Sequence, residues 1–204
     1  MMKKLLVIAA SLLLAANAHA QFGVVAGITS SSSTIEAAAA DVKNISQYHA
    51  GITYKFGFGN VFAIQPSLIY NMKGTKIAEI ANTKAEVDYK TGYLELPVQL
   101  QLGLGVGNAF RIYGFAEPFV GLAITNQVAG AETKTAQQTW DNVKTRAEYG
   151  FSLGAGLELI KHVQLSVKYF WNLGNIYGTQ VKMTDINIGE GTCNGIAASV
   201  AILF

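Results

Sequence analysis

Apolar and polar side chains alternate along most of this chain with a period of two. From Val163 to Leu173, every odd position is apolar or aromatic, and most even positions are polar. Successive side chains of a β-strand point to opposite faces, whereas a helix groups its apolar positions three or four residues apart. The pattern therefore predicts a strand with one apolar face and one polar face.

The same alternation recurs and predicts eight strands. The weakest case runs from Arg111 to Thr125, where Ile112, Ala116, Val120 and Leu122 are assigned outward because Glu117 then points inward. Several segments have the roughly 9–11 residues that a tilted membrane strand needs. The predicted strands are residues 22–29, 48–58, 62–73, 93–102, 111–125, 148–159, 163–173 and 195–204.

The connections between these strands alternate in length. Long polar segments occupy residues 30–46, 74–88, 126–146 and 174–194, and short ones occupy 57–60, 103–108 and 160–162. Bacterial outer-membrane barrels have an even strand number, long extracellular loops and short periplasmic turns. This alternation of long and short connections predicts an all-β fold. The predicted fold is an eight-stranded, antiparallel, up-and-down transmembrane β-barrel with extracellular loops and both termini periplasmic.

The first residues resemble a secretory signal peptide. Lys3 and Lys4 precede an apolar run, and Ala18-His19-Ala20 matches the small-x-small cleavage pattern. We expect residues 1–20 to be a signal peptide that is cleaved between Ala20 and Gln21, and residues 21–204 to be one outer-membrane barrel domain.

Composition favours a membrane protein over a soluble one. Of the residues, 50% are hydrophobic and only 14% are charged, against about 25% charged in a typical soluble domain. Removing Lys3 and Lys4 leaves 15 − 2 = 13 basic residues against 13 acidic ones. A nearly neutral chain gives no support for nucleic-acid binding.

The composition of the polar face indicates whether the apolar face of the barrel points outward or inward. A soluble barrel of the lipocalin type would alternate too, with its apolar face inside. Here the polar face is mostly Gly, Ser, Thr, Gln and Asn with isolated charges of both signs, which suits a cramped interior that side chains fill. The predicted lumen network comprises His49, Lys55, Lys73, Glu95, Gln99, Glu117, Glu148, Glu158 and Lys168.

Aromatic residues near the strand ends are predicted to form girdles at the membrane interfaces. Such girdles flank the apolar band of outer-membrane barrels. The candidates are Tyr48, Phe58, Phe62, Tyr70, Tyr149, Tyr169 and Trp171.

Several loose motifs occur together in order along the chain. They are Gly23-Val24-Val25-Ala26-Gly27-Ile28, residues 65–70 (QPSLIY) followed by Lys73-Gly74, residues 93–98 (YLELPV), and Tyr113-Gly114 with Pro118-Phe119-Val120-Gly121. With them, the chain resembles the outer-membrane β-barrel family common in Bacteroidetes, often labelled porin-family or PorT-type, and is similar in architecture to OmpX and the OmpA barrel. In such proteins Ile202-Leu203-Phe204 resembles the C-terminal signal that barrel-assembly machinery reads, with Phe204 at its end. The resemblance implies no common catalytic site.

No motif in the chain points clearly to chemistry. His49 and His162 lack neighbouring His or Cys at metal-ligand spacing. Gly103-Leu104-Gly105-Val106-Gly107 lacks the Lys and helix of a phosphate loop. Cys193 is the only cysteine, and we expect it in the last outer loop. We therefore predict no enzyme activity, no cofactor and no metal site.

The expected function is a structural or surface-interaction role in the outer membrane, with a filled lumen and no open pore. The expected partners are outer-membrane lipid, the barrel-assembly machinery and a surface ligand or protein bound through the long loops. Three alternatives remain open: a small-solute porin, an outer-membrane enzyme and an accessory part of a secretion system.

Overall fold

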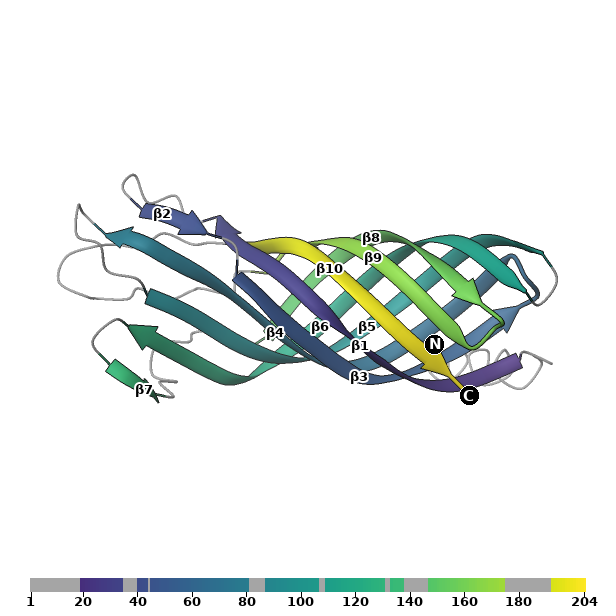
Figure 1. Ribbon diagram of the computed structural model, residues 1–204, viewed down its shortest axis with the longest axis horizontal. Helices are drawn as coiled ribbons and strands as arrows, with labels where there is room; N and C mark the ends of the chain where they lie inside the picture. The colour runs from purple at the N-terminus through teal and green to yellow at the C-terminus, as the bar shows by residue number, and fades with distance from the viewer. Residues whose placement is uncertain are drawn as a thin grey trace, which may run out of the picture.

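The computed structural model describes residues 19–34, 40–43, 45–80, 87–106, 109–130, 133–137, 147–174 and 192–204, and the regular elements within these ranges are all strands (Figure 1). They are β1 (His19–Thr34), β2 (Ala40–Lys43), β3 (Ile45–Phe58), β4 (Phe62–Ile80), β5 (Val87–Val106), β6 (Phe110–Gly130), β7 (Thr133–Gln137), β8 (Ala147–Leu159), β9 (Val163–Asn172) and β10 (Thr192–Leu203).

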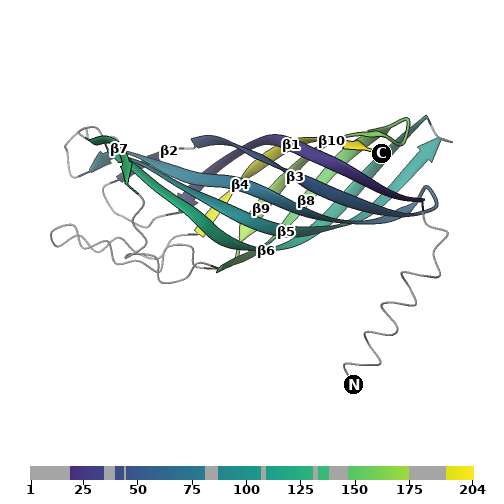
Figure 2. The same ribbon diagram turned by 90° about the horizontal axis from the view of Figure 1, so that it is seen from below.

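Eight of these strands form a closed antiparallel wall. Hydrogen-bonded neighbours follow the order β1-β3-β4-β5-β6-β8-β9-β10, and β10 pairs with β1 to complete the circle. Each wall strand thus pairs with the next wall strand in the sequence (Figure 2). The predicted eight-stranded, antiparallel, up-and-down barrel is confirmed.

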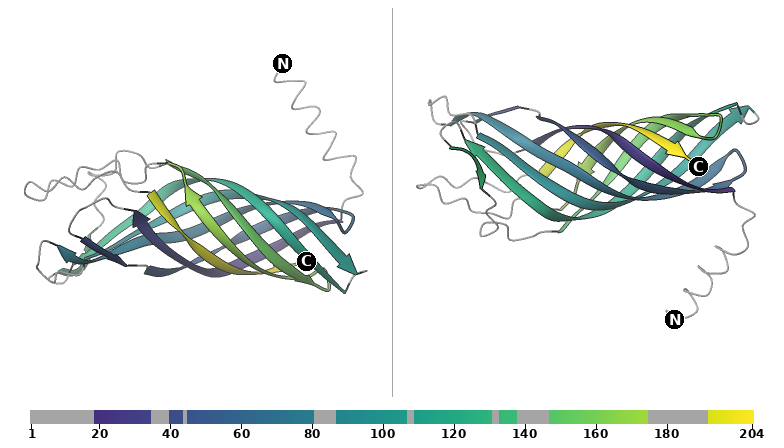
Figure 3. Two further views of the ribbon diagram at one scale, coloured as in Figure 1. Left: turned by 90° about the horizontal axis from the view of Figure 1, so that it is seen from above. Right: turned by 60° about the horizontal axis from the view of Figure 1, so that its bottom comes forward.

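Neighbouring strands are offset along the wall. Starting at Tyr48 in β3 and stepping through directly paired residues around the wall, the path returns to β3 at Phe58, ten residues further on. Closing a barrel with such a shear tilts its strands, typically by about 35–45°, and the oblique strands are visible in Figure 3. Eight strands leave an interior just wide enough for side chains to fill.

The apolar face points outward. Leu96, Val120 and Val167 are 49%, 55% and 56% exposed, whereas the neighbouring carboxylates of Glu95 and Glu117 are almost completely buried. The alternative barrel with an apolar interior is therefore wrong. The orientation assigned to the weak segment of residues 111–125 is confirmed, since Ile112, Val120 and Leu122 are exposed and Glu117 is buried.

The strands are longer at one end than the alternation predicts. Four regions predicted as loops contain strand: β1 continues to Thr34, β4 and β5 pair as far as Ile77 and Val87, β6 continues to Gly130, and β10 begins at Thr192. Two short strands lie in these regions as well, with β2 on β4 and β7 on β6. An alternation test depends on the side chains alone, whereas backbone pairing with a neighbour forms a strand and satisfies its amides whatever the side chains are.

The opposite end of the wall is closed by short turns. Gly59 has φ of +67° in the turn between β3 and β4, a conformation that glycine adopts without strain. Between β8 and β9, the His162 amide donates to the Leu159 carbonyl at 3.0 Å, and both intervening residues have positive φ. We call this the turn end of the barrel and the opposite one the loop end.

Candidate functional site: the polar lumen

Among the described residues, the inward faces of the wall strands bring charged side chains together in three clusters. The loop-end cluster is Lys73, Glu95 and Glu148 with Asn71 and Asn172, the middle cluster is Glu117 and Lys168 with His49, Thr29 and Ser199, and the turn-end cluster is Lys55, Arg111 and Glu158 with Gln101 and Gln164.

The loop-end cluster centres on one lysine between two carboxylates. Lys73 Nζ lies 2.7 Å from Glu95 Oε1 and 3.0 Å from Glu148 Oε1. Asn71 Nδ2 donates to Glu95 at 3.0 Å, and Asn172 Nδ2 donates to Glu148 at 2.6 Å. All five side chains are buried. Burying a charge is tolerated when it is both paired and hydrogen-bonded, and this cluster meets both conditions.

Aromatic rings surround the same lysine. Lys73 Nζ lies 4.5 Å from the ring centroid of Phe119, 5.0 Å from that of Phe170 and 5.5 Å from that of Tyr93. Cations are attracted to ring faces at distances up to about 6 Å. Rings and ion pairs together fill the lumen at this level.

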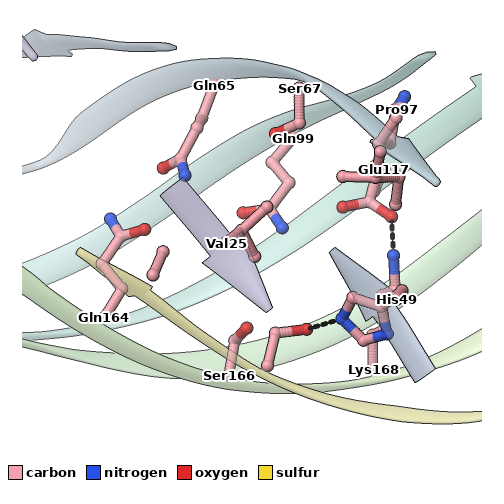
Figure 4. A pocket seen from close by; sticks show the side chains of 13 residues that line it. Val25, His49, Gln65, Ser67, Pro97, Gln99, Glu117, Gln164, Ser166 and Lys168 are labelled. Carbon is pink, nitrogen blue, oxygen red and sulfur yellow. Dashed lines mark hydrogen bonds and ion pairs between the residues drawn. The ribbon is translucent and has the colours of Figure 1, made fainter. Parts of the chain in front are cut away.

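The middle cluster contains an ion pair between β6 and β9 and a histidine from β3 (Figure 4). Lys168 donates to Glu117, to which Ser152 Oγ also donates at 3.4 Å. His49 is buried and sits between two hydroxyls, with Nδ1 2.9 Å from Thr29 Oγ1 and Nε2 2.8 Å from Ser199 Oγ.

A small cavity lies beside the middle cluster. Its volume is about 30 Å³, and its lining includes Gln99, Glu117 and Ser166. A water molecule needs roughly 10–15 Å³ in such a measure. The cavity therefore has room for about two or three waters and no space for a larger solute.

The turn-end cluster holds one carboxylate between two cations. Glu158 Oε2 lies 2.5 Å from Lys55 Nζ and 3.6 Å from Arg111 Nη1, and Gln164 Nε2 donates to it at 2.9 Å. Arg111 also donates to Gln101 Oε1 at 2.9 Å. The predicted residue Gln99 accepts from Gln101 Nε2 at 3.0 Å, at the edge of this cluster.

Formal charges balance within the part of the lumen that the structure describes. Its four cations, Lys55, Lys73, Arg111 and Lys168, face four carboxylates, Glu95, Glu117, Glu148 and Glu158. The predicted set omits Arg111. Its odd number places it on the same face as Glu117, and this parity could have identified it.

Aromatic rings on β6 fill the lumen against glycines on β8. Phe119 is paired with Gly150, Phe115 with Gly154, and Tyr113 with Gly156. A Cβ added to any of these glycines would lie 2.4 Å from the facing ring. Large and small side chains thus alternate across the seam, which leaves no space for another side chain.

The seven predicted girdle residues lie on the outward face or its edges. Phe58 and Phe62 pack at the turn end with ring centroids 5.7 Å apart. Toward the loop end, the centroids of Tyr48 and Tyr70 are 6.4 Å apart and those of Tyr169 and Trp171 are 4.6 Å apart, while Tyr149 is exposed. The wall therefore carries an aromatic group near each end.

Other predicted positions have these places in the structure. Ala20 and Gln21 both lie in β1, where Ala20 pairs with Phe56, and residues 1–18 lie outside the described part of the chain. The Phe204 amide donates to the Phe22 carbonyl at 2.7 Å. The placement of Cys193 in a loop is wrong, because this buried residue belongs to β10 and pairs with Ser33 in β1.

No group of three or more His, Cys, Asp or Glu side chains in the described ranges is arranged to hold a metal ion. The same ranges contain no helix with the length and apolarity that a membrane span requires.

Comparisons with known proteins concern the whole wall. Solved structures that resemble it include OprG from Pseudomonas aeruginosa (11% identity, TM-score 0.49, covering 92% of this chain and 97% of that one) and Neisserial surface protein A (10%, 0.46, 90% and 97%). Another is the attachment invasion locus protein Ail of Yersinia pestis, in complex with the heparin analogue sucrose octasulfate (10%, 0.45, 91% and 99%). No curated protein sequence matches the chain.

A family model described as the outer membrane protein beta-barrel domain matches residues 15–178. This match covers most of the chain and seven of the eight wall strands. The chain therefore belongs to the family of outer membrane protein β-barrel domains.

Proposed function

We propose that this protein is a closed barrel that acts at the cell surface, where it strengthens the outer membrane and binds a ligand or partner through its loop end. The observation that carries the proposal is the filled lumen. In the part of the lumen that the structure describes, three charge-paired clusters and the rings packed on β8 surround a cavity of about 30 Å³. In a barrel with no passage through it, the outer surface and the two ends are the parts that can contact ligands or partners.

The loop end offers a sheet that extends past the wall. β6 is paired with β8 only as far as Leu122, yet it continues to Gly130 in pairing with β5. These eight further residues add roughly 26 Å of strand, at about 3.3 Å per residue. With β2 on β4 and β7 on β6, five strands meet there in the order β2-β4-β5-β6-β7 (Figure 1).

The proposed orientation puts this extended sheet outside the cell and the turn end in the periplasm. Long extracellular and short periplasmic connections are usual for such barrels. In this orientation the outward aromatics near each end serve as girdles, cleavage between Ala20 and Gln21 leaves the new N-terminus in the periplasm, and Phe204 is available to the assembly machinery at the same end. We propose no catalytic role and no cofactor for the lumen side chains.

Planar-bilayer recording tests the closed lumen. Refolded full-length mature protein is expected to give no steady conductance, because ion pairs and rings block the path at more than one level. Lys73→Ala removes the cation of the loop-end cluster and is the matched variant, in which we expect some ion leakage. Steady single-channel steps from the wild-type protein would overturn the closed-barrel proposal and favour the small-solute porin.

Shortening the extended sheet tests the surface role. Residues 75–88 are replaced by a two-residue turn, and the variant is compared with the full chain in a deletion strain of the native host. Removal of residues 81–86 alone is the control. We expect all forms to restore resistance to detergents, but only the full chain and the control to restore surface adhesion. Equal adhesion by the shortened protein would contradict a role for this sheet.

The resemblance to Bacteroidetes barrels leaves a secretion-system role as a distinct outcome of these experiments. Restored detergent resistance together with a loss of secreted protein in the shortened variant would favour that role over adhesion.

A further inference from the structure

A shallow apolar groove crosses the outward face of the wall over β1, β10, β9 and β8. Its volume is about 700 Å³. Its lining combines the small side chains of Ala155 and Ala198 with the larger ones of Ile28, Val167, Leu165 and Val200. The four strands are consecutive neighbours in the wall, so the groove is a feature of the barrel surface and not of a loop.

The groove arises from side-chain size along one row of paired residues. Ile28 pairs with Ala198, Ala198 with Val167, and Val167 with Ala155. Large and small side chains therefore alternate across four strands. The next outward row toward the turn end holds larger side chains, with Val200 paired to Leu165 and Leu165 paired to Leu157. Ala198 thus lies between two branched side chains, and Ala155 lies between Val167 and Gly114 of β6.

The groove is continuous with the surface that this outer-membrane barrel presents to lipid. Its outward-facing side chains are aliphatic, and the aromatic groups described above lie beyond it toward the two ends. Within a bilayer such a surface contacts acyl chains, and a concavity lets a chain gain contacts on three sides that a convex wall cannot supply. An acyl chain is the occupant whose chemistry fits.

A positive charge lies at one end of the same two strands. β8 and β9, which carry Ala155, Leu157 and Leu165, are joined by the turn that contains Lys161. Lys161 is four residues beyond Leu157, and the last two of these form the turn, so the two residues are at most about 13 Å apart along the chain. That distance brings the turn to the level where a lipid headgroup meets water when the acyl chain occupies the groove.

We propose that this groove holds one acyl chain of an anionic phospholipid whose phosphate lies beside Lys161. This lipid stays at one place on the wall, whereas the other lipids around the barrel exchange freely with the bilayer. A lysine near an anionic surface contributes about 1 kcal/mol, which corresponds to roughly fivefold in binding.

Native mass spectrometry of the full-length mature protein in detergent tests this proposal. The protein is titrated with phosphatidylglycerol or with phosphatidylcholine of identical acyl chains. We expect one preferred phosphatidylglycerol adduct on the wild type. Ala155→Leu/Ala198→Leu fills the groove and should remove the preferred adduct, and Ala155→Leu alone is the milder variant if the pair folds poorly. Lys161→Gln should lower the preference for phosphatidylglycerol about fivefold, and Lys161→Arg should keep it.

Ala50→Leu is the matched control, since Ala50 is an exposed outward-facing alanine on β3 that does not line the groove. Its adducts should equal those of the wild type. Equal lipid retention by the groove-filled variants would overturn the proposal. So would loss of a protein dimer in these variants with no change in lipid adducts, because the groove would then be a contact between two copies of the chain.

Discussion

At the scale of single residues, the lumen depends on complementary pairs. Each buried carboxylate has a cation within reach, and each large ring on the β6–β8 seam faces a glycine. Removing one charge of a pair leaves the other charge buried without a partner, which destabilises the fold. Replacing a glycine with a larger residue makes its side chain overlap the facing ring.

Lys168→Met tests the charge pairing. The substitution leaves the carboxylate of Glu117 buried without its cation, and we expect a loss of about 3–5 kcal/mol in the free energy of unfolding. Glu117→Gln/Lys168→Met replaces both charges and should recover most of that loss. Urea unfolding of protein refolded in lipid vesicles measures both. A single variant as stable as the wild type would show that the pair contributes nothing.

Gly154→Ala tests the ring packing. The added Cβ would lie 2.4 Å from Phe115 Cζ and 2.5 Å from the Val167 carbonyl oxygen. We expect a cost of about 1–3 kcal/mol in the free energy of unfolding, as for other overpacked sites. Gly114→Ala on the outward face is the control, because the nearest atom is 3.9 Å from its added Cβ. The idea fails if the two variants have the same urea midpoint.

At the scale of elements, the strands pair over a greater length than the membrane needs, and one hairpin turn is built from unfavourable residues. Ile160 and Lys161 have φ of 52° and 61°, where Asn and Gly are the usual residues of a two-residue turn of this kind. A left-handed conformation costs about 1–2 kcal/mol for a side chain with a Cβ, and a β-branched one such as isoleucine is the least suited.

Ile160→Asn is therefore expected to stabilise the barrel by about 1 kcal/mol, since Asn tolerates this conformation and Ile160 is largely exposed. The unfolding rate in urea should fall, because the β8–β9 hairpin would open less readily. Val61→Asn is the control, because Val61 is an exposed residue of the β3–β4 turn whose φ is not positive. An unchanged or faster unfolding rate for Ile160→Asn would contradict the assigned strain.

At the scale of the whole molecule, closure removes every free edge from the wall. Unfolding must break two seams of backbone hydrogen bonds before any strand can leave. The barrel is therefore expected to remain folded in SDS at room temperature and to run at a different mobility after boiling. Gel electrophoresis of membrane-extracted protein, with circular dichroism to verify its strand content, measures this. A single mobility before and after boiling would contradict a closed barrel.

The sequence alone was sufficient to predict the architecture, because each wall strand has a different environment on each of its two faces. Lipid on one face and a packed lumen on the other impose a period of two, as from Val163 to Leu173, and even the weak segment around Glu117 was oriented correctly. The inward placement of the charged residues followed from the same parity.

The tertiary structure determines which charged side chains of the lumen pair with one another. Lys73 meets Glu95 and Glu148, and Lys55 meets Glu158, only because the shear of the closed wall brings these positions to the same height. The strand extensions, β2, β7 and the location of Cys193 also escaped prediction, since these segments are held by backbone pairing with a neighbouring strand, which a test of side-chain alternation does not detect. A period of two reports what surrounds a strand, whereas register and closure determine what each side chain touches.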